Sequence, residues 1–600
     1  MFRFVVLLAA TLAAGMPLAL VAEADTLGTV VITATRTLQP MGDTLASVDV
    51  ITRDDLALLP AADIADALQM HTGIEIARVG GPGQQTSLFL RGTDSNHVLV
   101  LVDGVRINPG TIGAAALQNI TPDMVERIEV VKGPRSTLYG SDAIGGVINI
   151  ITRKGAAAGT HVQVGAGSFG THSAGLSAGG SAGVTDASLS AYWLDSAGFP
   201  TRTGDTTNRG YRNLSLNGSL RTEAAGWQLS ATGWRAAGTS QYSDFYVTPV
   251  DQDFVTSALS VQAATRPAAD WHTRIVLGHA TDEISQNQSP DFLRTHRWQL
   301  DWQNDVTAGR WHELTAGLLL QREDATSASY GTGFDSRTQT RLYYLQDQAH
   351  YGRQRLLLAA GYTDSDTFGG HVTWNAEYGR HLGEMTFAWL AAGTAFRAPD
   401  ATDRFGYGGN PALRPEASRS WEAGLRSEIG ESQQLSVTAF RTDIHDLIQY
   451  VITDYTTYDG ENRNVDRARI TGVEASWQVS RGGWDARLGV TLQDPRDLST
   501  DSLLLRRARQ NVTLALARHI GPHEVSLDVL VAGERHDFGS PAPVRLAPYT
   551  LANLSARIVL ADDWVLVTRL ENLLDEHYAL AAGYNTPARS LFVSLRRSFR

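Results

Sequence analysis

The 600-residue chain holds 16 histidines and 63 acidic residues, but none of them stands in a recognisable catalytic motif. The chain contains no cysteine, which excludes disulfide frameworks, thiolate zinc sites and cysteine nucleophiles. No G-x-S-x-G sequence falls on a strand-to-helix turn, and H-E-x-x-H does not occur. These motifs would mark a serine hydrolase or a zinc protease. We therefore predict that the protein is not an enzyme and requires no cofactor.

Composition divides the chain into two parts. With 51 Lys+Arg and 63 Asp+Glu, the net charge of −12 argues against a general nucleic-acid binder. The apolar fraction of 43% is too high for a disordered chain. All 13 tryptophans lie at or after Trp193, and of the 18 tyrosines only Tyr139 precedes Tyr192. The chain therefore consists of two regions of different composition that join somewhere around residues 150–190.

Residues 1–24 have the pattern of an export signal. Arg3 precedes an apolar run, small residues follow, and the sequence at 22–24 fits an A-x-A cleavage site, so the mature chain would begin near Asp25. The alternative is an uncleaved membrane anchor. No later charge-free apolar run approaches the roughly 20 residues of a membrane helix. Export to the periplasm, the outer membrane or the medium is therefore expected, which excludes a cytosolic enzyme or a helical inner-membrane transporter.

From about residue 160 onward, apolar and polar residues alternate with the period of β-strands. In the run 524–532, for example, Val525, Leu527 and Val529 fall on one face. Secreted β-sandwiches would alternate too, but no linker divides the region into two or three of them. At roughly 20 residues per strand and loop, the region predicts an all-β transmembrane barrel of about 22 antiparallel strands.

The preceding region contains no tryptophan and predicts a small mixed domain. Its expected elements are a strand at 46–52, a helix between Asp54 and Gly73, a buried strand at 98–102, and strands at 128–131 and 147–151. A barrel this wide has an open lumen. Something must therefore plug it, and this α/β domain could either fold alone or sit as a plug within the barrel.

Several motifs carry a family resemblance. They are LRGTDSNHVLVLVDGVRIN at 90–108, VERIEVVKGPRSTLYGSDAIGGVINI at 125–150, FRAP at 396–399, NPALRPE at 410–416, SWEAG at 420–424 and ENLLD at 571–575. With these, the chain resembles the TonB-dependent outer-membrane receptors, and within them the vitamin B12 (cobalamin) receptors most closely. The resemblance implies a signal peptide at 1–24, a TonB box and linker at 25–40, a plug at 41–152 and a barrel at 153–600.

The resemblance also implies a function and partners. A receptor of this kind would transport cobalamin across the outer membrane of a Gram-negative bacterium as a monomer, energised through TonB and its inner-membrane complex, amid outer-membrane lipid and lipopolysaccharide. A ferric-siderophore receptor is the main alternative. A haem receptor is less favoured, because 400–409 lacks histidine. From other classes, a passive porin would not explain the plug or the TonB box, and an outer-membrane hydrolase would lack its catalytic residues.

The segment expected to bind TonB follows the cleavage site. Its residues are Asp25, Thr26, Leu27, Thr29, Val30, Val31, Ile32, Thr33 and Ala34. The β-branched run suits strand addition to a partner's sheet edge. The alternative is an ordinary internal strand. Two extra residues, Gly28 and Thr29, leave the register of pairing open.

The family pairs plug cations with barrel carboxylates, which would hold the plug as a latch. By motif the cations are Arg91 and Lys132 and the carboxylates are Glu422 and Glu474. Lys132 stands where arginine is more usual, so it offers a point charge rather than a two-pronged donor. The alternative is that these charges are solvated in a wet lumen.

Ligand contacts are expected from the upper plug loops at 80–87 and 108–116. The candidates are Gln84, Gln85, Thr86, Ser87, Thr111, Ile112 and Gly113, with Arg506 from the barrel. Neutral amides and hydroxyls suit the carboxamide rim of a corrin, although each could be only a turn residue.

Some cobalamin receptors bind calcium through acidic loops. The corresponding residues are Asp205, Asp244, Asp251 and Asp253. Calcium needs six to eight oxygen ligands, and Arg209 would repel a cation, so exposed loop charges are the favoured interpretation.

Overall fold

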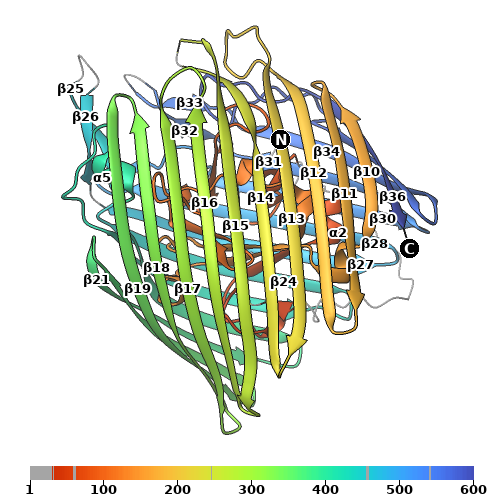
Figure 1. Cartoon of the computed structure of the whole chain (residues 1–600), viewed down its shortest axis with the longest axis vertical. Helices are drawn as coiled ribbons and strands as arrows, with labels where there is room; N and C mark the ends of the chain where they lie inside the picture. The colour runs from red at the N-terminus through yellow and green to blue at the C-terminus, as the bar shows by residue number, and fades with distance from the viewer. Residues whose placement is uncertain are drawn as a thin grey trace.

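Long antiparallel strands form a closed barrel in the computed structural model, as the alternation predicted (Figure 1). The structure describes residues 30–31, 33–58, 62–244, 246–454, 459–465, 467–539 and 542–599. The predicted signal peptide lies outside these residues. Within them, no helix combines the length and the apolar character that crossing a membrane demands.

The barrel has 22 long strands. In chain order they are β10 (Thr160–Gly167), β11 (Thr171–Ala182), β12 (Thr185–Phe199), β13 (Arg209–Ala224), β14 (Trp227–Ser243), β15 (Pro249–Ala268), β16 (Trp271–Gln286), β17 (Phe292–Ala308), β18 (His312–Ser329), β19 (Thr332–Tyr351), β20 (Gln354–Ser365), β21 (Gly369–His381), β22 (Thr386–Arg397), β23 (Glu416–Glu428), β24 (Gln433–His445), β27 (Arg467–Arg481), β28 (Trp484–Asp497), β30 (Gln510–Ile520), β31 (His523–Ala532), β34 (Tyr549–Ala561), β35 (Trp564–Glu571) and β36 (Ser590–Phe599). A two-residue strand, β29 (Ser502–Leu503), pairs with the end of β28. The ring closes where β10 pairs with β36, from Thr160 opposite Phe599 to Gly167 opposite Phe592.

The period-two pattern explains which side chains face the lumen. In β17, Trp298, Leu300 and Trp302 are exposed on the outer face, whereas Gln299 and Asp301 between them are buried inside. Successive strand residues point to opposite faces. The outer face is therefore apolar and the inner face polar, as a membrane barrel requires.

The two ends of the barrel differ in their connections. Turns at one end are short, such as 183–184 and 225–226, whereas the other end carries the long loops, such as 398–415 and 572–589, beside a few short turns such as 330–331. We call these the short-turn end and the long-loop end. Bacterial outer-membrane barrels place short turns in the periplasm and long loops outside. The long-loop segments contain α5 (Ala401–Phe405) and two hairpins, β25 (Ile448–Asp454) with β26 (Asp459–Asn464) and β32 (Arg535–Asp537) with β33 (Val544–Leu546).

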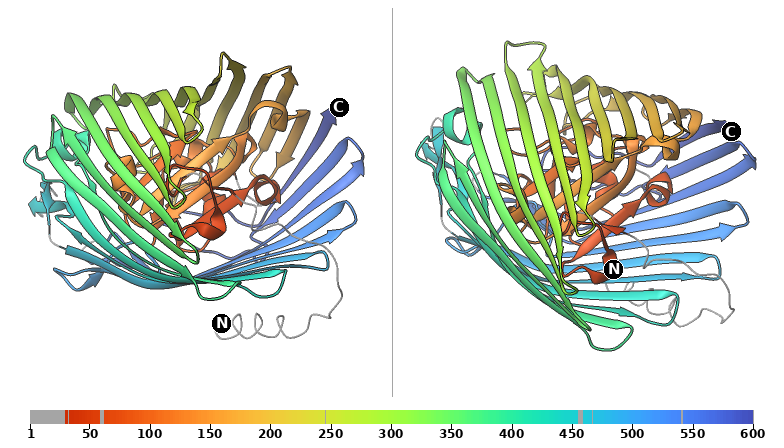
Figure 2. Two further views of the ribbon diagram at one scale, coloured as in Figure 1. Left: turned by 90° about the horizontal axis from the view of Figure 1, so that it is seen from below. Right: turned by 60° about the horizontal axis from the view of Figure 1, so that its bottom comes forward.

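The N-terminal domain lies inside the barrel, surrounded by its wall (Figure 2). Its main sheet has the order β3-β8-β9-β6-β7, and β4 pairs separately with β5. The bounds are β3 (Val48–Thr52), β4 (Ile74–Arg78), β5 (Thr86–Leu90), β6 (Val98–Val102), β7 (Val105–Arg106), β8 (Val125–Lys132) and β9 (Gly146–Thr152). Ile51, Ile128, Val130 and Ile148 are fully buried in its core. This is the predicted plug.

The plug helices are shorter than the sequence suggested. The single helix expected between Asp54 and Gly73 is instead α2 (Arg53–Leu58) and α3 (Ile64–Leu68), and α4 (Ser136–Tyr139) was not foreseen. The Asp63 carboxylate accepts hydrogen bonds from the amides of Ala65 and Asp66 and begins α3 as its N-cap. That cap starts a second helix within the stretch where one was expected.

The remaining described elements are short. They are β1 (Val30–Val31), β2 (Gln39–Pro40) and the 3-10 turns η1 (Met41–Asp43), η2 (Ser95–His97), η3 (Leu117–Asn119), η4 (Pro122–Met124) and η5 (Gly155–Ala158). The last of these joins the plug to β10.

Candidate functional site

The structure brings the four predicted latch residues together between plug and barrel. The Arg91 guanidinium follows β5 and donates to Glu422 on β23 at 2.6 Å and to Glu474 on β27 at 2.9 Å. It also lies 4.5 Å from the ring centroid of Phe440. All three charged side chains are at least nine-tenths buried. One plug arginine thus joins two barrel strands.

Lys132, at the end of β8, completes the cluster from the other side. Its Nζ lies 3.3 Å from Glu474 and 2.9 Å from Asp49, and it donates to the carbonyl of Thr72 at 2.6 Å. Burial alone would lower the pKa of Lys132, but the carboxylates of Asp49 and Glu474 raise it above its usual value. The ammonium group of Lys132 thus has three acceptors, although it cannot form the two parallel hydrogen bonds that an arginine could.

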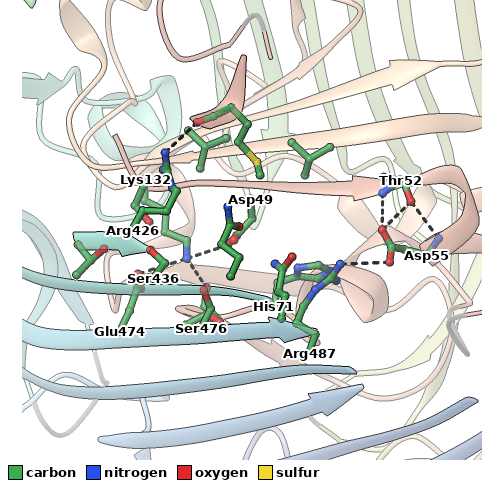
Figure 3. Close-up of a pocket in the computed structure, with 18 residues that line it drawn as sticks. Asp49, Thr52, Asp55, His71, Lys132, Arg426, Ser436, Glu474, Ser476 and Arg487 are labelled. Atoms are coloured by element: carbon green, nitrogen blue, oxygen red, sulfur yellow. Dashed lines mark hydrogen bonds and ion pairs between the residues drawn. The ribbon is translucent and has the colours of Figure 1, made fainter. Parts of the chain in front are cut away.

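A cavity of about 140 Å³ lies beside this cluster (Figure 3). We call it the latch cavity; Lys132, Glu474, Ser436 and His71 are among its lining residues. Burial, with the positive charge of Arg487 adding to it, lowers the pKa of His71 to about 4. A space lined by charges beside the latch gives its side chains room to rearrange.

Other plug–barrel ion pairs had no signal in the sequence. They include Arg36–Asp301 at 2.7 Å, Arg135–Glu377 at 2.5 Å, Arg355–Asp43 at 3.7 Å, Arg487–Asp55 at 3.4 Å and Arg507–Asp94. His97 and Glu416 add a hydrogen bond at 2.8 Å. Within the described residues, the plug–barrel ion pairs join the plug to strands from β17 to β28 and to the loop after β28. We call this sector the latched arc.

The first predicted ligand loop lies against the wall on the long-loop side. Gln84 is buried and donates to the carbonyl of Gln241 at 2.6 Å. Thr86 is also buried, and its hydroxyl donates a hydrogen bond to the carbonyl of Gln84. Gln85 is exposed and Ser87 is half-buried. Gln85 and Ser87 are therefore free to meet a ligand, while Gln84 and Thr86 hold the loop.

The second predicted loop contacts α5. The carbonyl of Thr111 accepts from the amide of Thr402 at 3.0 Å, and the Thr111 side chain is buried. Ile112 is half-buried. At Gly113, φ is +71°, and a Cβ would lie 3.0 Å from Asn96 and 3.2 Å from Asp400. Glycine is needed there, because the backbone adopts a conformation that other residues rarely take.

A cavity of about 70 Å³ lies beside this loop, lined by plug and barrel residues. Of its four arginines, Arg106 pairs with Asp142 and Arg297 with Glu323. Arg404 instead lies 4.5 Å from the ring centroid of Phe405 and forms no ion pair with a described carboxylate. Arg397 pairs with Asp400 at 2.8 Å, with Asp403 and with Glu416. The cavity has room for only two or three water molecules at about 30 Å³ each, so a large ligand must sit above it in the open mouth.

Arg506 does not reach the plug. Its Nε donates to Asp537 at 2.5 Å, and its guanidinium lies 5.1 Å from the ring centroid of Phe538, which is 67% exposed. Its neighbour Arg507 donates to the carbonyl of Gly92 at 3.2 Å and stacks 4.2 Å from the ring centroid of Phe89. Arg507 is thus a plug contact that the motif did not single out.

The four acidic loop residues each have protein partners. Asp205 pairs with Arg209 at 2.7 Å, Asp244 accepts from nearby backbone amides, Asp251 bonds Asn287 and Gln288, and Asp253 accepts from Thr239. In the part of the chain that the structure describes, no three acidic or histidine side chains are grouped to hold a metal. At least one oxygen of each carboxylate is thus already engaged by Arg209 or by a neutral donor.

The predicted TonB box is described only in part. Asp25, Thr26, Leu27, Thr29 and Ile32 lie outside the described residues. Val30 and Val31 pair with Pro40 and Gln39 in a two-residue ladder. Thr33 donates from its amide and its hydroxyl to Glu129 of β8, and Ala34 is buried. The end of the segment is therefore attached to the plug sheet.

Known relatives match both domains. The chain matches the family described as "TonB dependent receptor-like, beta-barrel" over residues 158–573 and the "TonB-dependent Receptor Plug Domain" over residues 40–147. It is 31% identical to "Vitamin B12 transporter BtuB" of Vibrio vulnificus, over 93% of this chain and 92% of that protein. It is 29% identical to the protein of the same name from Photobacterium profundum, over 95% of both chains.

A solved structure has the same fold. The siderophore receptor PirA from Acinetobacter baumannii superposes with a TM-score of 0.79 at 18% identity, over 92% of this chain and 98% of that one. At 18% sequence identity, this structural similarity supports the fold alone. Because the matched families cover the barrel and the plug together, the chain belongs to the TonB-dependent receptors, outer-membrane proteins of Gram-negative bacteria that act as receptors and transporters rather than enzymes.

Proposed function

We propose that this protein binds cobalamin at the cell surface and transports it across the outer membrane with energy delivered through TonB. The observation that carries the proposal is the 31% identity to a vitamin B12 transporter over nearly the whole chain. The siderophore receptor with the same fold is only 18% identical. Sequence similarity therefore favours cobalamin over a ferric siderophore.

The charges at the long-loop end support the same ligand. Of the four arginines beneath the mouth, Arg106, Arg297 and Arg397 are each paired with at least one carboxylate. Among the described residues of this cavity, that leaves Arg404 as the one arginine without such a partner. An anionic iron complex would need cations that are free to bind it. A corrin rim of carboxamides instead needs neutral donors and acceptors, such as exposed Gln85 and half-buried Ser87.

Coupling to TonB would use the segment 25–34 by strand addition. In this proposal, Val30 and Val31 leave their two-residue pairing with β2 and pair with TonB. The latch of Arg91, Lys132, Glu422 and Glu474 then holds the plug until force arrives. Buried ion pairs suit such a latch, because leaving one partner unpaired is costly.

The test is binding of purified protein to cyanocobalamin and to a panel of ferric siderophores. We expect cobalamin binding at micromolar affinity or tighter. Siderophore binding of that strength without cobalamin binding would overturn the ligand. Growth on limiting cobalamin, lost in a deletion strain and restored by the intact gene, tests transport; failure of a strain carrying Val31→Pro to grow would support TonB coupling.

A further inference from the structure

A second cavity, of about 210 Å³, lies between the plug and the wall around the β10–β36 closure. We call it the seam cavity. Its wall comes from strands β10–β13 and β34–β36, and its plug side from α2, α3 and the loop at 80–82. Phe199 and Pro587 line it at the long-loop end, and Arg557 and Arg596 line it toward the short-turn end. The cavity therefore follows the wall along the lumen.

Small side chains on the inner wall explain why this space exists. Ser594 of β36, Gly165 of β10 and Ser173 of β11 are direct neighbours across three strands. A Cβ added at Gly165 would meet first Ser173 at 2.6 Å and then two atoms of β36, all of them barrel atoms. Elsewhere on the wall the plug is closer. A Cβ added at Gly361 would lie 2.6 Å from the carbonyl of Thr137, and one added at Gly489 would lie 2.5 Å from the hydroxyl of Thr72, both in the plug. The plug thus stands back from the wall at the seam.

The attachments of the plug are unequal around the barrel. The latched arc, strands β17 to β28 with the following loop, holds the plug through the ion pairs described above. At the seam, the described residues form no plug–wall ion pair, and the contacts are hydrogen bonds such as Gln163 to Asp123 at 2.7 Å and Tyr211 to Asn119 at 3.2 Å. Separating the plug from the wall is therefore easiest at the seam.

The first predicted ligand loop, residues 80–87, covers the seam cavity at the long-loop end. A Cβ at Gly81 would lie 2.9 Å from Phe199, and one at Gly83 would lie 1.9 Å from Tyr211. Only glycine lets this backbone lie flat on β12 and β13. A ligand held by Gln85 and Ser87 would rest on the segment that closes the cavity.

We propose that the seam cavity marks the route by which the ligand passes the plug. When TonB pulls and the latch opens, the plug moves away from β34–β36, while the other ion pairs of the latched arc and the chain connection to β10 keep it attached. The cavity must widen greatly, since its present volume holds only about seven waters. Arg53, Arg557 and Arg596 line the cavity near the short-turn end, where Asp123, 3.9 Å from Arg53, is the only carboxylate among the described lining residues. The exit therefore accepts a solute that carries a negative group. The route rests on the proposed transport function but not on the identity of the ligand.

The absence of cysteine from the chain makes the route testable. In Ser594→Cys, the introduced thiol is unique and faces the seam cavity. After the protein has folded, a bulky methanethiosulfonate reagent is attached through a disulfide and later removed with a reductant. We expect the modified protein to take up ligand at least about tenfold more slowly, with its Kd within about twofold and its uptake restored by reduction.

The matched control is Ser260→Cys. Ser260 is buried on β15 opposite Gly278, where an added Cβ would lie 3.1 Å from Val105 of the plug. It therefore faces the lumen but lines neither the seam cavity nor the latch cavity, so the same modification should leave most of the uptake intact. Undiminished uptake by modified Ser594→Cys, or an equal loss in modified Ser260→Cys, would overturn the route. Uptake is followed with whichever of cyanocobalamin and the ferric siderophores the unmodified protein binds. Failure of the ligand assignment is thereby separated from failure of the route.

Discussion

Replacing Arg91 by methionine should weaken the attachment of the plug measurably. The Arg91 guanidinium is 5% exposed and serves both Glu422 and Glu474. Removing one partner of a buried ion pair costs about 3–5 kcal/mol. Glu474 keeps Lys132, and Glu422 keeps the indole N–H of Trp389 at 2.9 Å. We therefore expect the lower figure, about 3 kcal/mol.

Hydrogen exchange of plug amides in detergent measures this loss. About 3 kcal/mol corresponds to roughly 100-fold faster exchange at amides that are exposed when the plug loosens. Lys132→Met should have a smaller effect, because Glu474 keeps Arg91 and Asp49 is partly solvated.

The matched control is Arg341→Met. Arg341 is 57% exposed and lies 3.8 Å from Asp364, and an exposed pair contributes at most about 1 kcal/mol. Exchange in Arg91→Met within about threefold of the wild type, or an equal acceleration in Arg341→Met, would refute the reasoning.

Three further predictions concern other parts of the chain. Val31→Pro should abolish energised uptake while leaving ligand affinity unchanged, because proline removes a donor from the added strand; wild-type uptake would contradict the TonB-box assignment. Gly83→Ala should weaken ligand binding about tenfold or more in calorimetric titration, because its Cβ would lie 1.9 Å from Tyr211, whereas Gly104→Ala, with a similar positive φ and no atom within 4 Å, should not. Burial holds the pKa of His71 at about 4, so between pH 6.5 and 4 the unfolded chain binds a proton that the folded chain resists, and stability falls by up to about 3 kcal/mol as pH drops. His71→Gln should lack that component, and an identical loss of Tm in both proteins between pH 7 and 4.5 would disprove it.

The barrel could be predicted because its signal is local. Each strand is indicated by alternation of apolar and polar residues over a few positions. The change in aromatic content places the junction of plug and barrel only within residues 150–190. The plug helices were harder, because the N-cap at Asp63 begins a second helix inside one apparent pattern. The latch was predictable only through motifs shared with the family.

Contacts between residues far apart in the chain could not be predicted from the sequence. Arg36 and Asp301 are 265 positions apart, and no local pattern connects them. Arg506 and Arg507 are adjacent and chemically identical, yet Arg506 has φ of +67°, and only Arg507 reaches the plug. The row of Gly165, Ser173 and Ser594 forms only once the two ends of the barrel meet, so its small side chains look ordinary in sequence.

The pairing of β10 with β36 also dictates an order of assembly. These strands join residues near 160 to residues near 599, so the ring cannot close until the last strand has been made and delivered. Until then the nascent sheet has two open edges, which invite wrong partners. The plug precedes the sheet in the chain and can be surrounded as the sheet curls, without being threaded through a finished pore. Closure is thus the step that both seals the wall and confines the plug.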